Sequence, residues 1–131
     1  MPIKYDIITD KQLVLAKGSG VITGIDVIRH LDALALDDRY KAPMKKLVDY
    51  RTIDSIIITS EEAYLIAQKK KKLARIFTGE RCAFVAPGEL AHDSSRVHQA
   101  LLYGSGLKTE VFRRIEDALK WLDVALDMNY E

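Results

Sequence analysis

Apolar and polar residues recur with two periods along this chain, and the two periods predict strands and helices in turn. Residues 3–9 alternate between apolar and polar side chains, which is typical of a strand with one solvated face. Residues 13–16 form a second, more apolar strand that ends at Gly18-Ser19-Gly20. Because the two strands are joined by a very short turn, we expect them to form a hairpin.

Later segments with a helical period predict four helices. Thr23 is the predicted N-cap of the first helix, whose apolar stripe ends at Asp37-Asp38. Thr59 and Glu62 form a capping box at the start of the second helix. The third is expected to begin at about Asp93 or Ser94. The last has the clearest apolar stripe, over residues 115–126.

Three further strands lie between these helices, at residues 46–50, 81–86 and 109–112. The segment 81–86 is apolar at every position after the first, as expected for a central parallel strand covered on both faces. The order is strand, strand, helix and then three strand-helix units. It predicts an α/β fold with a mixed sheet of five strands and about four helices, in a single domain over residues 1–131.

Composition narrows the function classes. The 131 residues include 20 Lys plus Arg and 19 Asp plus Glu, which gives a formal net charge of +1. Because a dedicated nucleic-acid binder should carry an excess of basic residues, this balance argues against a nucleic-acid partner. Uninterrupted apolar runs reach only five residues, so no transmembrane segment is expected. The N-terminus shows no signal-peptide pattern, which predicts a cytoplasmic protein.

No catalytic, cofactor or metal motif is assembled in the sequence. Gly18-Ser19-Gly20 lacks the third glycine of a dinucleotide loop. The histidines show no metal-ligand spacing. Cys82 lies inside an apolar run, where a small buried side chain is expected and a reactive thiolate is not. We therefore expect a protein that binds rather than catalyses, without cofactor or metal.

The run Lys69–Lys72 resembles a basic patch, but four consecutive helical residues point in four directions. Lys70 falls on the apolar stripe of its helix, seven residues after Ala63. We expect its stem to lie along the edge of the core, with the ammonium in water.

The carboxyl ends of the later strands are the best candidate for a ligand or partner site, because ligands of such sheets bind beyond those ends. Arginines at the start of the last helix oppose its dipole unless an anion lies there, although the neighbouring Glu116 and Asp117 could neutralise them. The candidate residues are Asp49, Arg51, Pro87, Gly88, Arg113 and Arg114.

Three stretches resemble the small stand-alone bacterial SpoIIAA-like domains of the STAS superfamily. They are Leu47-Val48-Asp49-Tyr50-Arg51, Cys82-Ala83-Phe84-Val85-Ala86-Pro87, and Val111-Phe112-Arg113 with Glu116-Asp117-Ala118-Leu119-Lys120-Trp121-Leu122. The resemblance covers about residues 3–126 and implies a mixed sheet whose first strand is an antiparallel edge. It also implies a non-enzymatic role in protein-protein regulation, as in anti-sigma-factor antagonists. A distant similarity to CRAL-TRIO lipid carriers implies the alternative, a carrier or sensor of an apolar, lipid-like ligand.

Anti-sigma-factor antagonists are switched by phosphorylation of a serine at a helix start. Ile53-Asp54-Ser55 resembles that motif, but the apolar Ile56-Ile57-Ile58 follows where small residues belong, and Ser60 lies beside Glu61 and Glu62, which would repel a phosphate. An intact phospho-serine switch at Ser55 or Ser60 is therefore not expected. The partners predicted are an unknown protein, with a lipid-like or small anionic ligand as an alternative. Trp121 and Val124 widen the apolar face of the last helix and suggest a homodimer.

Overall fold

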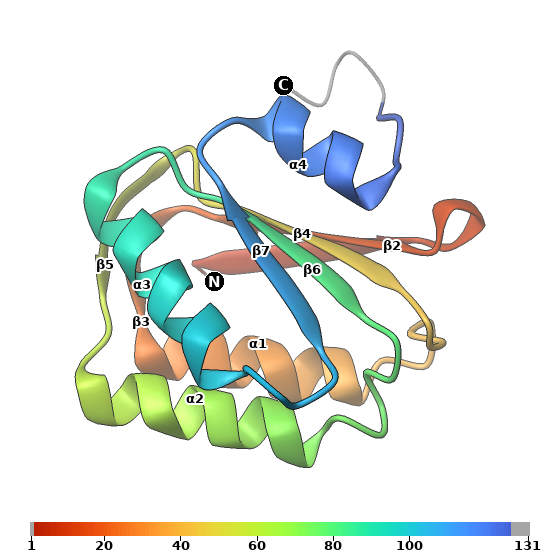
Figure 1. Ribbon diagram of the computed structural model, residues 1–131, viewed down its shortest axis with the longest axis horizontal. Helices are drawn as coiled ribbons and strands as arrows, with labels where there is room; N and C mark the ends of the chain where they lie inside the picture. Colours follow the sequence, from red (N-terminus) through yellow and green to blue (C-terminus); the bar gives the residue numbers. More distant parts are fainter. Residues whose placement is uncertain (1, 127–131) are drawn as a thin grey trace.

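The computed structural model describes residues 2–126, and a five-stranded mixed sheet runs through its centre (Figure 1). The strand order is β1-β2-β4-β6-β7. β1 pairs antiparallel with β2 at one edge, and the other neighbours are parallel, as predicted. The strands are β1 (Ile3–Ile8), β2 (Leu13–Gly18), β4 (Lys45–Asp49), β6 (Arg81–Val85) and β7 (Lys108–Phe112).

Two short strands that the sequence pattern did not predict form a separate parallel pair. They are β3 (Gly20–Thr23) and β5 (Ile53–Ile57). The chain leaves β2 for β3 through Gly20, whose φ of +64° is a conformation that favours glycine. Ile22 and Ile56 are buried in this pair, so it extends the apolar core beyond the carboxyl edge of the main sheet.

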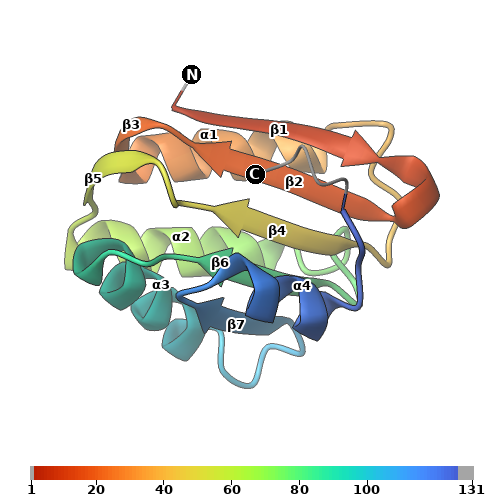
Figure 2. The ribbon, with the colours of Figure 1, turned by 90° about the horizontal axis from the view of Figure 1, so that it is seen from above.

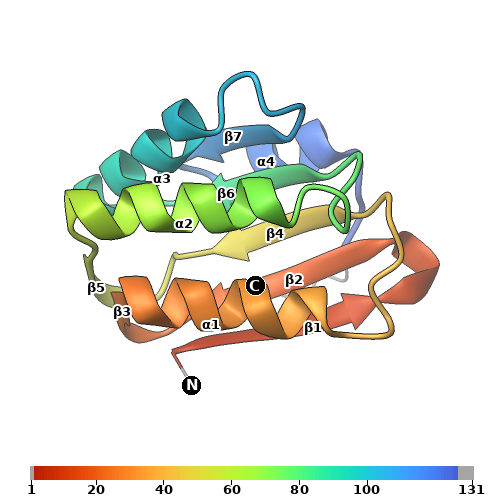
Figure 3. The ribbon, with the colours of Figure 1, turned by 90° about the horizontal axis from the view of Figure 1, so that it is seen from below.

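Helices cover both faces of the main sheet (Figures 2 and 3). The first face carries α1 (Gly24–Ala35), α2 (Ser60–Lys72) and α3 (Glu89–Leu101), and the second carries α4 (Ile115–Leu122). β6 lies between β4 and β7, and its Cys82, Ala83 and Val85 are buried, as predicted for a central strand.

Capping boxes define the starts of α1 and α2. In each, a threonine side chain accepts from a backbone N–H three residues on, and the carboxylate at that position accepts from the threonine's own N–H. The pairs are Thr23 with Asp26 and Thr59 with Glu62. Both helices therefore begin where the sequence predicts.

The limits of α3 and α4 differ from the sequence prediction. α3 begins at Glu89 rather than at Asp93 or Ser94, because the extended backbone of Gly88 lets the helix start directly after the turn. α4 ends at Leu122, four residues earlier than its stripe predicts, because Asp123 turns to a left-handed φ of 56°.

Each sheet face has its own apolar core. On the α4 face, Ile115, Ala118 and Leu122 pack against the strands, and Trp121 and Val124 join this cluster. On the other face, Cys82 is buried as a free thiol, and burial raises its pKa to about 11, as expected of a small packed side chain. No helix within residues 2–126 is long and apolar enough to cross a membrane.

Candidate functional site

The six predicted site residues lie along one edge of the sheet. Asp49 ends β4, and in register with it β6 ends at Val85 and β7 at Phe112. Pro87 and Gly88 follow β6, and Arg113 and Arg114 follow β7. Parallel pairing therefore places the segments after the three strands at the same edge.

Each arginine at this edge has a carboxylate partner. Arg51 makes two hydrogen bonds of 3.0 Å from its guanidinium to the buried Asp49. Arg113 lies 3.0 Å from Glu89 and donates to the Pro87 carbonyl at 3.2 Å, and Arg114 lies 3.5 Å from Glu116. The cations that suggested an anion at the start of α4 are thus balanced locally.

An open groove of about 310 Å³ lies at this edge, between β5 and the start of α3. We call it the edge groove. It is lined by Tyr50, Arg51, Ile53, Asp54, Ser55, Ile56, Pro87, Gly88, Glu89, Leu90 and Ala91. Three of the six predicted residues line it, and Asp49, Arg113 and Arg114 lie outside that lining. Leu90 is 67% exposed and gives the groove an apolar contact surface.

The two serines considered as phosphorylation sites occupy different environments. Ser55 is a half-buried residue of β5 that lines the edge groove, five residues before α2. Ser60 is exposed and is the first residue of α2, next to the capping Thr59. The start of α2 at Ser60 agrees with the sequence analysis.

A second polar cluster, which the sequence analysis missed, lies inside the protein between the sheet and the three helices. Lys70 was expected to reach water, but its side chain is 2% exposed, and its Nζ lies 2.6 Å from the carboxylate of Glu80, which is also buried. Burial, the largest single influence, would lower the pKa of Lys70, but the charge of Glu80, the neighbouring Cys82 and the hydrogen bond to Glu80 together more than offset it, so the pKa is raised. Lys70 can be buried because the buried carboxylate of Glu80 balances its charge.

Lys46 of β4 and His30 of α1 also lie in this interior. Burial lowers the pKa of Lys46 to about 8, with the Lys70 charge adding to the effect. Burial also lowers the pKa of His30 to about 2, so its imidazole is neutral. Within the described part of the chain, neither ring nitrogen of His30 has a hydrogen-bond partner.

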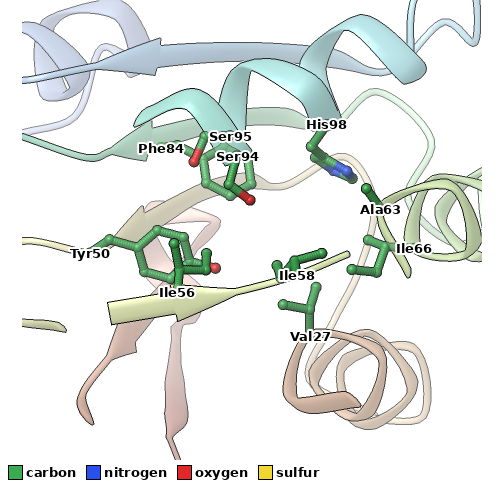
Figure 4. Close-up of a pocket in the computed structure, with 10 residues that line it drawn as sticks. All are labelled: Val27, Tyr50, Ile56, Ile58, Ala63, Ile66, Phe84, Ser94, Ser95 and His98. Atoms are coloured by element: carbon green, nitrogen blue, oxygen red, sulfur yellow. The ribbon is translucent and has the colours of Figure 1, made fainter. Parts of the chain in front are cut away.

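Two small cavities occupy this interior. One, of about 40 Å³, is lined mainly by apolar side chains from α1, α2, β5 and β6, with His98 and two serines of α3 at its border (Figure 4). The other, of about 30 Å³, is lined by both lysines, both histidines, Cys82 and several apolar residues. His30, Cys82 and His98 are far apart in the sequence but border the same cavity.

The apolar surface of α4 that suggested a homodimer packs against its own domain. Trp121 contacts the Phe112 ring at a centroid distance of 5.9 Å, and the Arg81 guanidinium lies 4.4 Å from its ring centroid. Val124 packs on the same cluster. Intramolecular packing therefore accounts for these residues without a second chain.

Known structures resemble this one, although no family model and no curated protein matches the chain. An uncharacterized protein of the DUF3478 family from Shewanella loihica PV-4, described as having a SpoIIAA-like fold, matches with 24% identity and a TM-score of 0.57. That match covers 92% of this chain and 91% of the other. The unphosphorylated anti-sigma factor antagonist SpoIIAA matches with 8% identity and a TM-score of 0.55, over 94% of this chain and 99% of its own.

Proposed function

We propose that this chain, which has the SpoIIAA-like fold of the STAS superfamily, is a non-catalytic regulatory module that binds another protein at the edge groove. The observation that carries the proposal is the groove itself, which lies at the carboxyl edge and presents the exposed Leu90 between polar side chains. Apolar anchors within a polar rim are the usual anatomy of a protein interface.

The charges in and beside the groove also favour a protein partner over a small anion. Arg51 and Arg113 are already engaged with Asp49 and Glu89, so an incoming anion would have to displace a carboxylate. A protein surface can instead add contacts around the existing pairs and cover the apolar side chains. The role proposed needs no phosphate on Ser55 or Ser60.

The test compares two exposed leucines at opposite ends of the fold. The variants are Leu90→Asp in the groove and Leu36→Asp just after α1, where Leu36 is 84% exposed. The amounts of host proteins captured by the wild type are compared with the amounts captured by each variant. Each candidate partner is then purified, and its affinity for the wild type and for both variants is measured by calorimetry. We expect a partner whose affinity falls at least tenfold with Leu90→Asp and is unchanged by Leu36→Asp. A partner equally sensitive to both, or to neither, contradicts binding at the groove.

The alternative, a carrier or sensor of an apolar, lipid-like ligand, is supported by the apolar lining of the first cavity. The sizes of the two interior cavities favour only a compact ligand. Cavities of about 40 and 30 Å³ cannot contain a long acyl chain unless the helices move away from the sheet. Native mass spectrometry of the purified protein tests this. A co-purifying lipid mass would support the carrier role, and bare protein would count against it.

A further inference from the structure

Among residues 2–126, the interior between the sheet and α1–α3 holds two buried lysines, Lys46 and Lys70, and one carboxylate paired with them, Glu80 on Lys70. The buried carboxylates within the described residues are Asp49 and Glu80, and they pair with Arg51 and Lys70. Lys46 is 3% exposed and has no buried carboxylate of its own. Burying a charge without a partner is costly, so an anionic partner for Lys46 would stabilise the fold.

The cavity beside Lys46 has the donors that an anion needs. Besides Lys46 and Lys70, it is bordered by His30 and His98. A neutral imidazole carries one N–H donor, and both nitrogens of His30 are buried with no hydrogen-bond partner among residues 2–126. A volume of about 30 Å³ suffices for one or two water-sized groups, which is the scale of a carboxylate.

The apolar cavity adjoins this one, since Val27, Tyr50, Phe84 and His98 line both. Figure 4 shows Val27, Ile58 and Ile66 facing the same space. The volume of about 40 Å³ has room for a few methylene groups. Together the two cavities offer a cationic end and a short apolar end.

We propose that this interior binds a short-chain monocarboxylate, with the carboxylate at Lys46 and His30 and the alkyl end in the cavity bordered by Ile58 and Ile66. A dicarboxylate would leave its second charge in the apolar end, and a long chain would exceed the volume. His30 and Ile3 also line an open depression between β1 and α1, so the cavity beside Lys46 lies close to the surface on that side. The apolar cavity adjoins the edge groove, since Tyr50 and Ile56 line both, but this proposal concerns the buried cations and does not depend on protein binding at the groove.

The test titrates acetate, propionate, butyrate, octanoate and chloride into the purified protein at matched ionic strength. Binding is followed by calorimetry and by NMR contacts between the ligand and the methyl groups of Val27 and Ile58. We expect propionate or butyrate to bind more tightly than chloride and octanoate and to contact those methyls. Absence of carboxylate binding, or chloride binding as tight as butyrate without methyl contacts, overturns the proposal.

Three variants locate the ligand. Lys46→Met keeps the shape and removes the charge, and it should weaken butyrate at least tenfold, whereas the partly exposed control Lys69→Met should not. Ala63→Leu narrows only the apolar cavity, so it should weaken butyrate more than acetate. This third variant keeps the alkyl placement testable if Lys46→Met fails to fold. Unchanged butyrate affinity in folded Lys46→Met, or equal effects of Ala63→Leu on both acids, contradicts the placement.

Discussion

The pair of Lys70 and Glu80 shows how one residue's environment decides its role. The 2.6 Å contact lies in the core, with the Lys70 ammonium also 5.0 Å from the centroid of the Phe77 ring. Lys69, the neighbouring residue, pairs with Asp32 at 2.8 Å on a partly exposed surface. The two ion pairs have similar geometry and differ chiefly in access to water, which determines the cost of breaking each.

Removing the buried carboxylate should therefore be far more costly than removing the exposed one. We expect Glu80→Gln to lower the free energy of unfolding by about 3–5 kcal/mol, because it leaves Lys70 charged and buried beside Lys46. Asp32→Asn should lower it by at most about 1 kcal/mol. Urea denaturation followed by circular dichroism measures both. The double variant Lys70→Met with Glu80→Gln should recover much of the loss, and equal costs for the two single variants would contradict this account.

The sequence could not reveal this interior because its members come from separate elements. Lys46 begins a strand pattern and Lys70 lies on a helix, and only the tertiary fold brings them to one cavity. The sole local signal was Lys70 on an apolar stripe, which is equally compatible with a stem that leads to water. Glu80, the carboxylate that pairs with Lys70 in the interior, is ten residues away in the sequence and lies outside any helix or strand.

At the scale of elements, the starts of α1 and α2 depend on each other. Gly24 is the first residue of α1, and a Cβ there would lie 2.8 Å from Cδ and 2.9 Å from Cβ of Glu62. Glu62 completes the capping box of α2 through its hydrogen bond from the Thr59 N–H. The missing side chain at Gly24 thus makes room for the cap of the next helix.

Gly24→Ala should consequently destabilise the protein by about 1 kcal/mol or more, since the crowded Glu62 must leave its capping position. Gly88→Ala is the matched control, because Gly88 also adjoins a helix start but a Cβ there meets no atom within 4 Å. Thermal unfolding of both variants measures the difference. A Gly24→Ala variant no less stable than Gly88→Ala would show that Glu62 relaxes without losing its cap.

Sequence features that span a few residues predicted the helices and strands that they define. They did not predict the strands that form only by pairing with a segment far away in the sequence. The capping box at Thr59 and the apolar run of β6 are visible within a few residues. β3 and β5 are short, and each becomes a strand only by pairing with a segment about thirty residues away. The candidate edge was predictable because parallel strands end together, whereas the groove depends on the unpredicted β5 and on the early start of α3.

At the scale of the whole molecule, the β3–β5 pair is the least supported part of the framework. It shares no strand with the five-stranded sheet, and two-stranded sheets are marginally stable by themselves. β4 and β6, in contrast, are paired on both sides and covered by helices on both faces. Local opening should begin at β3–β5, next to the edge groove.

Native-state hydrogen exchange followed by NMR tests this order. We expect hydrogen-bonded amides of β5 to exchange at least tenfold faster than those of β6, a difference of about 1.4 kcal/mol in opening free energy. Amides of α4 provide a reference outside both sheets. Equal protection of β5 and β6 would mean that the two sheets open as one cooperative unit.

The side chains of the two outer strands of the main sheet affect whether this protein can associate with itself. β1 exposes Lys4 and Asp6, and β7 exposes Lys108 and Glu110, so both edges present charged side chains beside their unpaired backbone groups. Such charges discourage another chain from extending the sheet, which protects a protein against edge-to-edge aggregation. The same protection disfavours recognition by strand addition and leaves side-chain contacts as the means of docking.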